Sequence, residues 1–197
     1  MKISTLILAA GSSSRLGRPK QLLRFEGKTL IERITQVALS VSDQVLIVLG
    51  ANETLIRPHL EALVLANTSK LEISFNADWE EGMGKTLSFG VEKLAKNADA
   101  ILVLLSDQLF VDEVLLRKMM QTFAESNLPI VACEYAEQLA VPILFDKTVF
   151  ADLMSLNGDK GAKVLLKKYS DKLGSVPFPL GICDVDTPED LKKYELS

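Results

Sequence analysis

The sequence predicts an α/β fold in which a mostly parallel sheet carries helices on both faces. Continuous apolar runs rich in Val, Ile and Leu recur along the chain, and such runs fit strands that are buried on both faces. Amphipathic segments lie between these runs, and an alternation of strand and helix is typical of parallel sheets. The expected strands are residues 3–10, 44–50, 71–75, 100–105 and 129–135, with a further apolar run at 140–145.

Two amphipathic segments predict helices with one apolar face each. In residues 29–41 that face consists of Leu30, Ile34, Val37 and Val41. In residues 111–126, Asp112 is a residue type that caps helix N-termini. The apolar stripe of this second helix consists of Val114, Leu115, Met119 and Phe123. Ligands of such sheets bind beyond the carboxyl ends of the strands, so functional residues are expected just after each strand.

Composition and charge restrict the class of protein. The chain has 197 residues, 48% hydrophobic and 24% charged, and no linker or repeat divides it, so we expect one domain over residues 1–197. Its net charge of −4 offers no broad basic surface, so nucleic acid is not an expected partner. The apolar run at 3–10 is too short to span a membrane, and Lys2 alone makes a poor signal peptide. We therefore expect a soluble, cytoplasmic protein without a membrane partner.

The cysteines and the single histidine offer little chemistry. Cys133 and Cys183 lie 50 residues apart, without the paired spacing of a zinc or redox site, and we expect two buried free thiols. His59 follows Pro58 on an expected surface helix, where a solvated side chain is a better interpretation than a catalytic one.

The loop after the first strand carries the first functional signal. The stretch "LILAAGSSSRLGRPKQLL" passes from an apolar strand into small residues that let a backbone approach a ligand closely. Arg15, Arg18 and Lys20 follow within six residues. A plain solvated loop rarely carries three cations directly after a buried strand, so their charge favours the binding of a phosphate chain. The dinucleotide fingerprint G-x-G-x-x-G is absent because Ser13 occupies its second glycine position, which argues against NAD.

A second glycine-rich loop resembles the end of a P-loop without being one. "GMGKTLSFG" contains the Gly-Lys-Thr triplet, but Trp79 stands where the motif requires its first glycine. This argues against an ATPase of that type, and Lys85 is interpreted as an ordinary loop lysine. Thr86 and Ser88, in the first turns of the helix expected there, remain able to bind hydroxyls or a base.

Two acidic residues follow apolar segments and suit a divalent cation. Asp107 lies just past the run at 100–105. It either reaches a phosphate-bound Mg²⁺, or Ser106 or Asp107 starts the next turn. In "DVDTPEDL", Thr187 and Pro188 are typical of a helix start. That helix start does not account for Asp186, which could direct a second carboxylate at the metal.

These loops together resemble a known family. "LAAGSSSRLGRPK", "NADWEEGMGKTLSFG", "SDQ", "GDKGAK" and "DVDTPEDL" occur in the order expected of molybdenum cofactor cytidylyltransferases, within the wider family of molybdopterin nucleotidyltransferases. The first and last motifs are shared by many nucleotidyltransferases. The more specific part combines "N-x-x-W-x-x-G-M" with "GDKGA". The sequence departs from the pattern at Leu109 (usually proline), Thr86 (usually serine) and Ala140 (usually glycine), the last where the family's acceptor pocket is expected.

The resemblance implies one nucleotidyltransferase domain with a Rossmann-like sheet. It would transfer CMP from CTP to the phosphate of molybdopterin or the molybdenum cofactor and release pyrophosphate, with Mg²⁺ as cofactor and a molybdenum hydroxylase as a possible partner. It assigns catalytic roles to Lys20, Arg15 and Asp107, with Asp107 and Asp186 as metal ligands. It assigns nucleotide binding to Leu8, Ala9, Ala10, Gly11, Lys20, Asn76, Gly82, Met83, Thr86 and Ser106.

The choice of CTP depends on one residue. "LAAG" resembles the family members that use CTP, whereas "LAGG" resembles those that use GTP. The extra methyl of Ala10 would narrow the space beside a purine.

Two other functions stay open. One is a cytidylyl- or uridylyltransferase acting on a sugar or polyol phosphate, and the other is a non-catalytic nucleotide-binding partner of a molybdenum enzyme.

Overall fold

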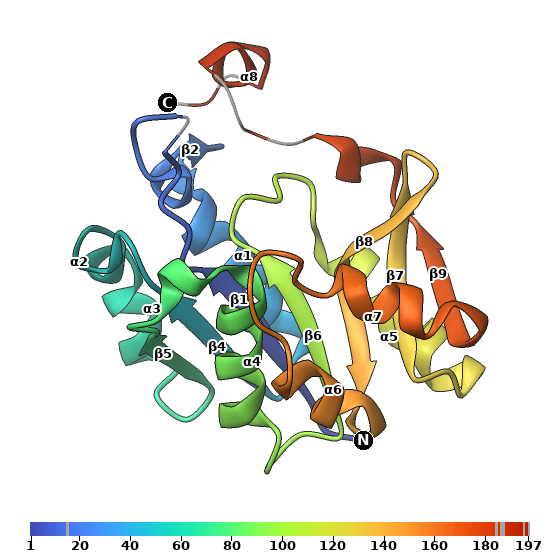
Figure 1. Ribbon diagram of the computed structural model, residues 1–197. Coiled ribbons are helices and arrows are strands. Elements are labelled where there is room, and N and C mark those ends of the chain that lie inside the picture. Colours follow the sequence, from blue (N-terminus) through green and yellow to red (C-terminus); the bar gives the residue numbers. More distant parts are fainter. Residues whose placement is uncertain (15, 184, 186–187, 195, 197) are drawn as a thin grey trace.

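The computed structural model describes residues 1–14, 16–183, 185, 188–194 and 196. Within this part of the chain, seven strands form one sheet in the order β5-β4-β1-β6-β8-β7-β9 (Figure 1). β8 is antiparallel to both of its neighbours, β6 and β7, and the other pairings in the sheet are parallel. The predicted mostly parallel α/β sheet is confirmed.

The strands lie close to the predicted positions. They are β1 (Ile3–Ala9), β4 (Gln44–Leu49), β5 (Leu71–Phe75), β6 (Ala100–Leu105), β7 (Ile130–Tyr135), β8 (Gln138–Asp146) and β9 (Leu173–Pro177). A small hairpin, β2 (Arg24–Phe25) with β3 (Lys28–Thr29), stands apart from the main sheet. The sequence analysis did not predict this hairpin or β9. It was also wrong to expect burial on both faces of β5, which is one of the two edge strands of this sheet and exposes Glu72 and Phe75.

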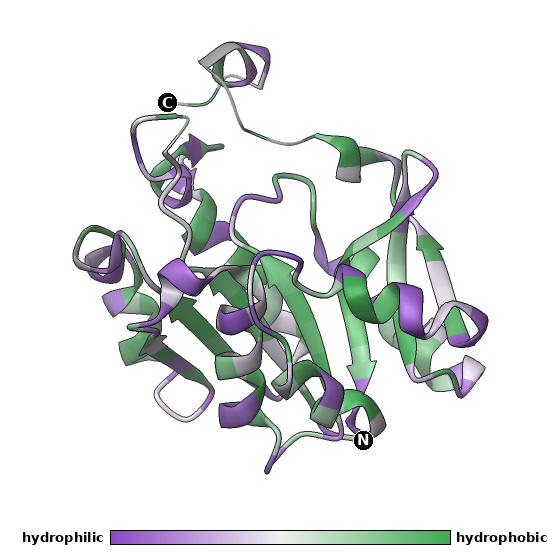
Figure 2. Cartoon of the chain, in the orientation of Figure 1, coloured by the Kyte–Doolittle hydropathy of each residue, from purple (hydrophilic) through white to green (hydrophobic). Residues whose placement is uncertain are grey.

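Helices cover both faces of the sheet and make three layers. One face carries α1 (Leu30–Val41), α2 (Glu53–Ile56), α3 (Glu61–Ala66) and α5 (Glu113–Ser126). The other face carries α4 (Met83–Leu94), α6 (Phe150–Met154) and α7 (Lys163–Lys168). Successive residues of β1 alternate between the two layers, with Ile7 on the α1 side and Leu6 and Leu8 on the α4 side. The central strands are the most hydrophobic part of the chain in Figure 2.

Helix α5 confirms one prediction and corrects another. Asp112 caps α5, since its carboxylate accepts a hydrogen bond from the Leu115 amide at 2.8 Å. Val114, however, is 75% exposed and does not belong to the buried stripe.

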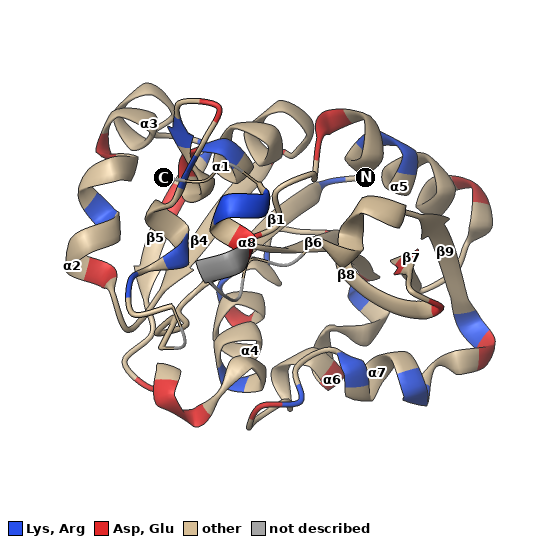
Figure 3. Ribbon diagram, turned by 90° about the horizontal axis from the view of Figure 1, so that it is seen from above, with Lys and Arg blue, Asp and Glu red and all other residues tan. Residues whose placement is uncertain are grey.

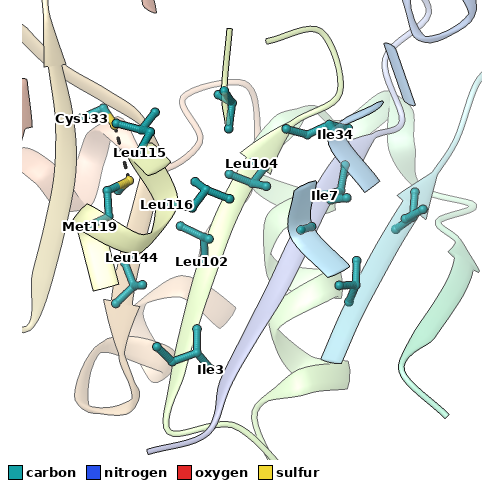
Figure 4. Close-up of a cluster of buried hydrophobic side chains, with 14 of the residues drawn as sticks. Ile3, Ile7, Ile34, Leu102, Leu104, Leu115, Leu116, Met119, Cys133 and Leu144 are labelled. Atoms are coloured by element: carbon teal, nitrogen blue, oxygen red, sulfur yellow. Dashed lines mark hydrogen bonds between the residues drawn. The ribbon is translucent and has the colours of Figure 1, made fainter. Parts of the chain in front are cut away.

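Cys133 is buried and its thiol donates to the sulfur of Met119 at 3.5 Å (Figure 4). Burial raises the pKa of this thiol to about 12. Cys183 is half-buried, so the prediction of two buried thiols holds for Cys133 alone.

The C-terminal segment returns to the carboxyl edge of the sheet. Val185 and Leu196 pack in one apolar cluster with Leu109, which lies in the loop after β6. The ring of Tyr194, just after α8 (Pro188–Lys193), contacts that of Phe110 edge-to-face at 6.0 Å. No helix in the described part of the chain has the length and apolar character needed to cross a bilayer.

Candidate active site

A cavity of about 510 Å³ opens where the carboxyl ends of β1 and β6 meet. The chain runs outward from β1 through β4 to β5 and then returns to β6 on the other side of β1, which is the kind of crossover point where α/β sheets bind ligands. Figure 3 views the molecule from this side. The cavity is lined by Leu8, Ala10, Gly11, Ser12, Ser13, Lys20, Gln21, Trp79, Glu80, Gly82, Met83, Thr86, Leu105, Ser106, Asp107 and Asp159.

The loop after β1 is held in place by side chains that bind its backbone. Gln21 is buried, and its amide nitrogen donates to the carbonyls of Ala9 at 3.2 Å and Gly11 at 3.3 Å. Ser13 has a φ of 55°, in the left-handed region, and its hydroxyl accepts from the Lys20 amide at 3.0 Å. The loop that the sequence predicts to bind phosphate is therefore a folded turn of defined shape.

The start of α4 forms the second wall. Gly82 caps this helix with a φ of 106°, and a Cβ there would lie 2.5 Å from the Asp159 carboxylate. The amide of Gly84 donates to the carbonyl of Gly158 at 2.7 Å, so residues 157–161 lie directly on the helix N-terminus. The N-terminus of a twelve-residue helix carries partial positive charge, which suits an anion in the cavity.

The end of β6 supplies the carboxylate. Asp107 lies 3.6 Å from the ammonium of Lys20, with 31% of the Asp107 side chain and 15% of the Lys20 side chain exposed. A cation and an anion thus face the same cavity from two different loops. Lys85 instead pairs with Asp78 at 3.8 Å and Glu81 at 3.4 Å and does not line the cavity, which agrees with its interpretation as an ordinary lysine.

Most of the residues predicted for the site line this cavity. They are Leu8, Ala10, Gly11, Lys20, Gly82, Met83, Thr86, Ser106 and Asp107. Two predicted residues are not among the lining residues. Ala9 is buried in the core beneath the loop, and Asn76 is buried beneath α4, where its amide donates to the Thr86 hydroxyl at 3.2 Å. Arg15 and Asp186 lie outside the described residues.

The sequence analysis missed several lining residues. Gln21 and Asp159 were not singled out, although Asp159 belongs to the quoted "GDKGA" motif. A buried glutamine that binds carbonyls has no signature in one sequence. Ser88 was considered for ligand binding, but its hydroxyl donates to the carbonyl of Met154 at 2.7 Å and faces α6.

A second cavity of about 470 Å³ adjoins the first, and the two share Leu8, Met83, Leu105 and Asp159. The second cavity extends towards β7, β8 and α7. Its apolar lining also includes Leu87, Val103, Ala136, Ala140, Val141, Ile143, Ala162, Leu166 and Ile182. Its polar lining consists of Gln108, Tyr135, Gln138, Asp159, Lys160 and Lys163.

The donor set of the first cavity fits a divalent cation that is shared with phosphates. Among the described residues no group of three or more His, Cys, Asp or Glu side chains forms a metal site, so a cage built from protein ligands alone does not occur there. Mg²⁺ characteristically takes one or two carboxylates and completes its shell with phosphate oxygens and water. Asp107 lines the cavity beside the proposed phosphate loop and meets this requirement.

Residues 5–173 match the MobA-like NTP transferase domain. The chain belongs to this family. It is 31% identical to the purine catabolism protein PucB of Bacillus subtilis (strain 168) over 195 residues, which covers 94% of this chain and 92% of that protein. A probable molybdenum cofactor guanylyltransferase of Synechococcus elongatus is 47% identical over 45 residues, 23% of each chain.

A solved structure supports the same assignment. Rv0371c from Mycobacterium tuberculosis H37Rv superposes with a TM-score of 0.82 at 28% identity, over 98% of this chain and 97% of that one. Its complex with manganese superposes with a TM-score of 0.78 at 25% identity, over 98% of both chains. As a MobA-like NTP transferase, the chain has nucleotidyl transfer as its reaction class.

Replacing Gln21 by Met tests how the β1 loop is held. The variant removes the donor to two carbonyls, and a buried acceptor left without its partner costs about 1–3 kcal/mol. We expect the dissociation constants of CTP and GTP, measured by calorimetry, to rise about ten-fold as the loop loses its shape. The control is Gln121→Met, which makes the same change on the exposed face of α5 and should alter neither binding nor stability. Unchanged nucleotide affinity in Gln21→Met would contradict the role of Gln21.

Proposed function

We propose that this protein transfers CMP from CTP to the phosphate of molybdopterin or the molybdenum cofactor and releases pyrophosphate. The observation that carries the proposal is the pair of adjoining cavities at the carboxyl edge of the sheet, one with cationic and backbone groups and one mainly apolar. The first suits a nucleoside triphosphate and the second suits an acceptor that reaches the α-phosphorus through the shared boundary.

The first cavity offers groups that suit a triphosphate. The small residues Gly11, Ser12 and Ser13 allow phosphates to approach the backbone, and the ammonium of Lys20 faces the same space. The N-terminus of α4 adds its dipole from the other side. We assign triphosphate contacts to Lys20 and to Arg15. Arg18 is exposed, and we assign it a lesser role.

Asp107 would hold Mg²⁺, with Asp186 as the second proposed ligand. Two observations support a divalent cation: the carboxylate of Asp107 in the cavity, and the manganese complex of the similar protein Rv0371c. When bound, the ion would neutralise phosphate charge at the reacting centre.

The chain's own residues then act by positioning and charge. The acceptor phosphate is already an anion, so it needs no base, and one of its oxygens attacks the α-phosphorus as the bond to pyrophosphate breaks. Lys20 stabilises the negative charge of the phosphates during this in-line displacement. His59 is half-buried in the turn Arg57–Leu60 and lines neither cavity, which agrees with a reaction that uses no histidine.

The polarity of the second cavity favours a pterin over a polyol. A sugar or polyol phosphate carries many hydroxyls, and each requires a hydrogen-bond partner when it is taken from water. The lining of the second cavity is mainly apolar, with Gln108, Tyr135 and Gln138 as neutral polar groups. A fused ring system has flat apolar faces and polar edges, and it fits this lining better. Lys160 and Lys163 could pair with an anionic group of the acceptor.

The methyl group of Ala10 supports CTP as the donor. Ala10 lines the first cavity and is only 6% exposed. Gly50 lies close behind this residue, since a Cβ on Gly50 would come within 2.8 Å of the Ala10 Cβ. We infer that a base bound beside Ala10 meets this methyl, which leaves less space for a purine than for a pyrimidine.

The product would be a cytidylylated cofactor for a molybdenum hydroxylase, and we propose the cytoplasm as the place of reaction.

A panel of substrates tests the proposed function. Pyrophosphate release should be measured for CTP, GTP, ATP and UTP, each with molybdopterin, molybdenum cofactor, and sugar and polyol phosphates. The proposal expects CTP with molybdopterin or its molybdenum form to be the fastest pair. Turnover confined to a sugar or polyol phosphate would support the alternative transferase. Nucleotide binding without turnover of any acceptor would support a non-catalytic partner.

Replacing Asp107 by Asn tests the metal assignment. The change keeps the side-chain shape but removes the charge, and the loss of a ligand charge should lower kcat/KM at least about a hundred-fold. Manganese affinity in the presence of CTP, followed by electron paramagnetic resonance, should fall as well. The control Asp171→Asn changes an exposed aspartate outside both cavities and should alter neither quantity. Near wild-type turnover of Asp107→Asn at saturating magnesium would contradict the assignment.

Replacing Ala10 by Gly tests the base preference. Removing the methyl should shift the ratio of kcat/KM for CTP over GTP towards GTP by roughly ten-fold, since one methyl contributes about 1–3 kcal/mol to discrimination. The control Ala98→Gly removes a buried methyl remote from both cavities and should leave the ratio unchanged. An unchanged ratio in Ala10→Gly would show that the base is selected elsewhere.

A further inference from the structure

The sheet divides beside the second cavity. β6 and β8 pair through residues 100–103 and 143–146, and their pairing stops there. β6 continues through Leu105 towards Asp107, while β8 turns aside (Figure 1). The second cavity lies in this fork, since Val103 and Leu105 line it from one strand and Val141 and Ile143 from the other.

A bulge in β8 produces the fork. Ala132 of β7 pairs with Ile143, but the next residue, Cys133, pairs with Ala140, so Val141 and Pro142 are extra residues on the β8 side. Proline has no amide hydrogen for a ladder and is typical of bulges. Bulges redirect strands and often lie next to active sites. The carbonyl of Val141 is consequently available to side chains.

Gln108 bridges the fork with one carboxamide. Its oxygen accepts from the amide of Leu105 at 3.4 Å, and its nitrogen donates to the carbonyl of Val141 at 2.9 Å. A carboxamide offers the same donor and acceptor as a peptide group, so Gln108 replaces the pairing that the two strands lose. The hydroxyl of Tyr135 donates to the same Val141 carbonyl at 3.2 Å.

We propose that Gln108 is a positioning residue that fixes Asp107 relative to the acceptor. This inference rests on the proposed function, in which Asp107 serves the transferred phosphoryl group and the second cavity holds the acceptor. Gln108 follows Asp107 directly in the chain, and its side chain ties their turn to the wall of the acceptor cavity. It lines the second cavity and not the first. Loss of the Gln108 side chain should therefore misalign the acceptor and the Asp107 carboxylate while leaving nucleotide binding intact.

Steady-state kinetics of two matched variants test this. In Gln108→Leu we expect kcat to fall about ten- to a hundred-fold and the acceptor KM to rise, because small misplacements of reacting groups have effects of that size. The CTP dissociation constant should stay within about two-fold. Gln121→Leu makes the same change at an exposed side chain of α5 that lines neither cavity, and it should leave kcat unchanged. A parallel loss of kcat, CTP affinity and melting temperature in Gln108→Leu would overturn the proposal in favour of a general structural role.

Amide hydrogen exchange tests the bridge without any acceptor. Exchange in peptides covering residues 104–109 and 140–142 should speed up in Gln108→Leu and stay at the wild-type rate in Gln121→Leu, whose changed side chain is exposed on α5. Unchanged exchange in Gln108→Leu would overturn the proposal. If the wild-type protein turns over no acceptor, the proposed function fails, whereas the exchange result still decides whether Gln108 holds the fork.

Discussion

The arrangement of both cavities depends on a contact between two stretches of backbone. The amide of Gly84, in the first turn of α4, donates to the carbonyl of Gly158 at 2.7 Å. A Cβ at Gly84 would lie 2.6 Å from the carbonyl oxygen of Asn157, so glycine is required for this approach. The contact holds the N-terminus of α4 at the carboxyl edge of the sheet. Met83 and Asp159, one from each side of it, line both cavities and form their shared boundary together with Leu8 and Leu105.

Around this boundary the chain separates its tasks among different elements. The loop after β1, shaped by Gln21, faces the first cavity with small residues and Lys20. The end of β6 brings Asp107 to the same cavity, and Gln108 turns away from it towards β8. A nucleotidyl transfer between two phosphates needs alignment and charge neutralisation more than it needs proton transfer. A rigid sheet edge with loops of defined shape meets that need.

Much of this architecture could be predicted because its signals are local. The strands β1, β4 and β6 are continuous apolar runs, and the small and cationic residues after β1 predict the lining of the first cavity. Features that arise from long-range pairing could not be predicted. The fork at Val141 exists because β7 and β8 change register, and one sequence does not display register. Gln21 and Gln108 act through backbone partners far along the chain or on another strand, so their residue type alone carries no functional signal. Val114 shows the opposite error, since an apolar residue at nearly the right helical spacing is exposed.

The central claim is that the nucleotide occupies the first cavity and leaves the second for the acceptor. A crystal structure with a non-hydrolysable CTP analogue and Mn²⁺ tests it most directly. We predict an anomalous manganese peak within coordination distance of the Asp107 carboxylate, the triphosphate against Gly11–Ser13 and Lys20, and the cytosine beside Ala10. The second cavity should stay free of nucleotide. Nucleotide density between β6 and β8, or manganese bound away from Asp107, would contradict the account.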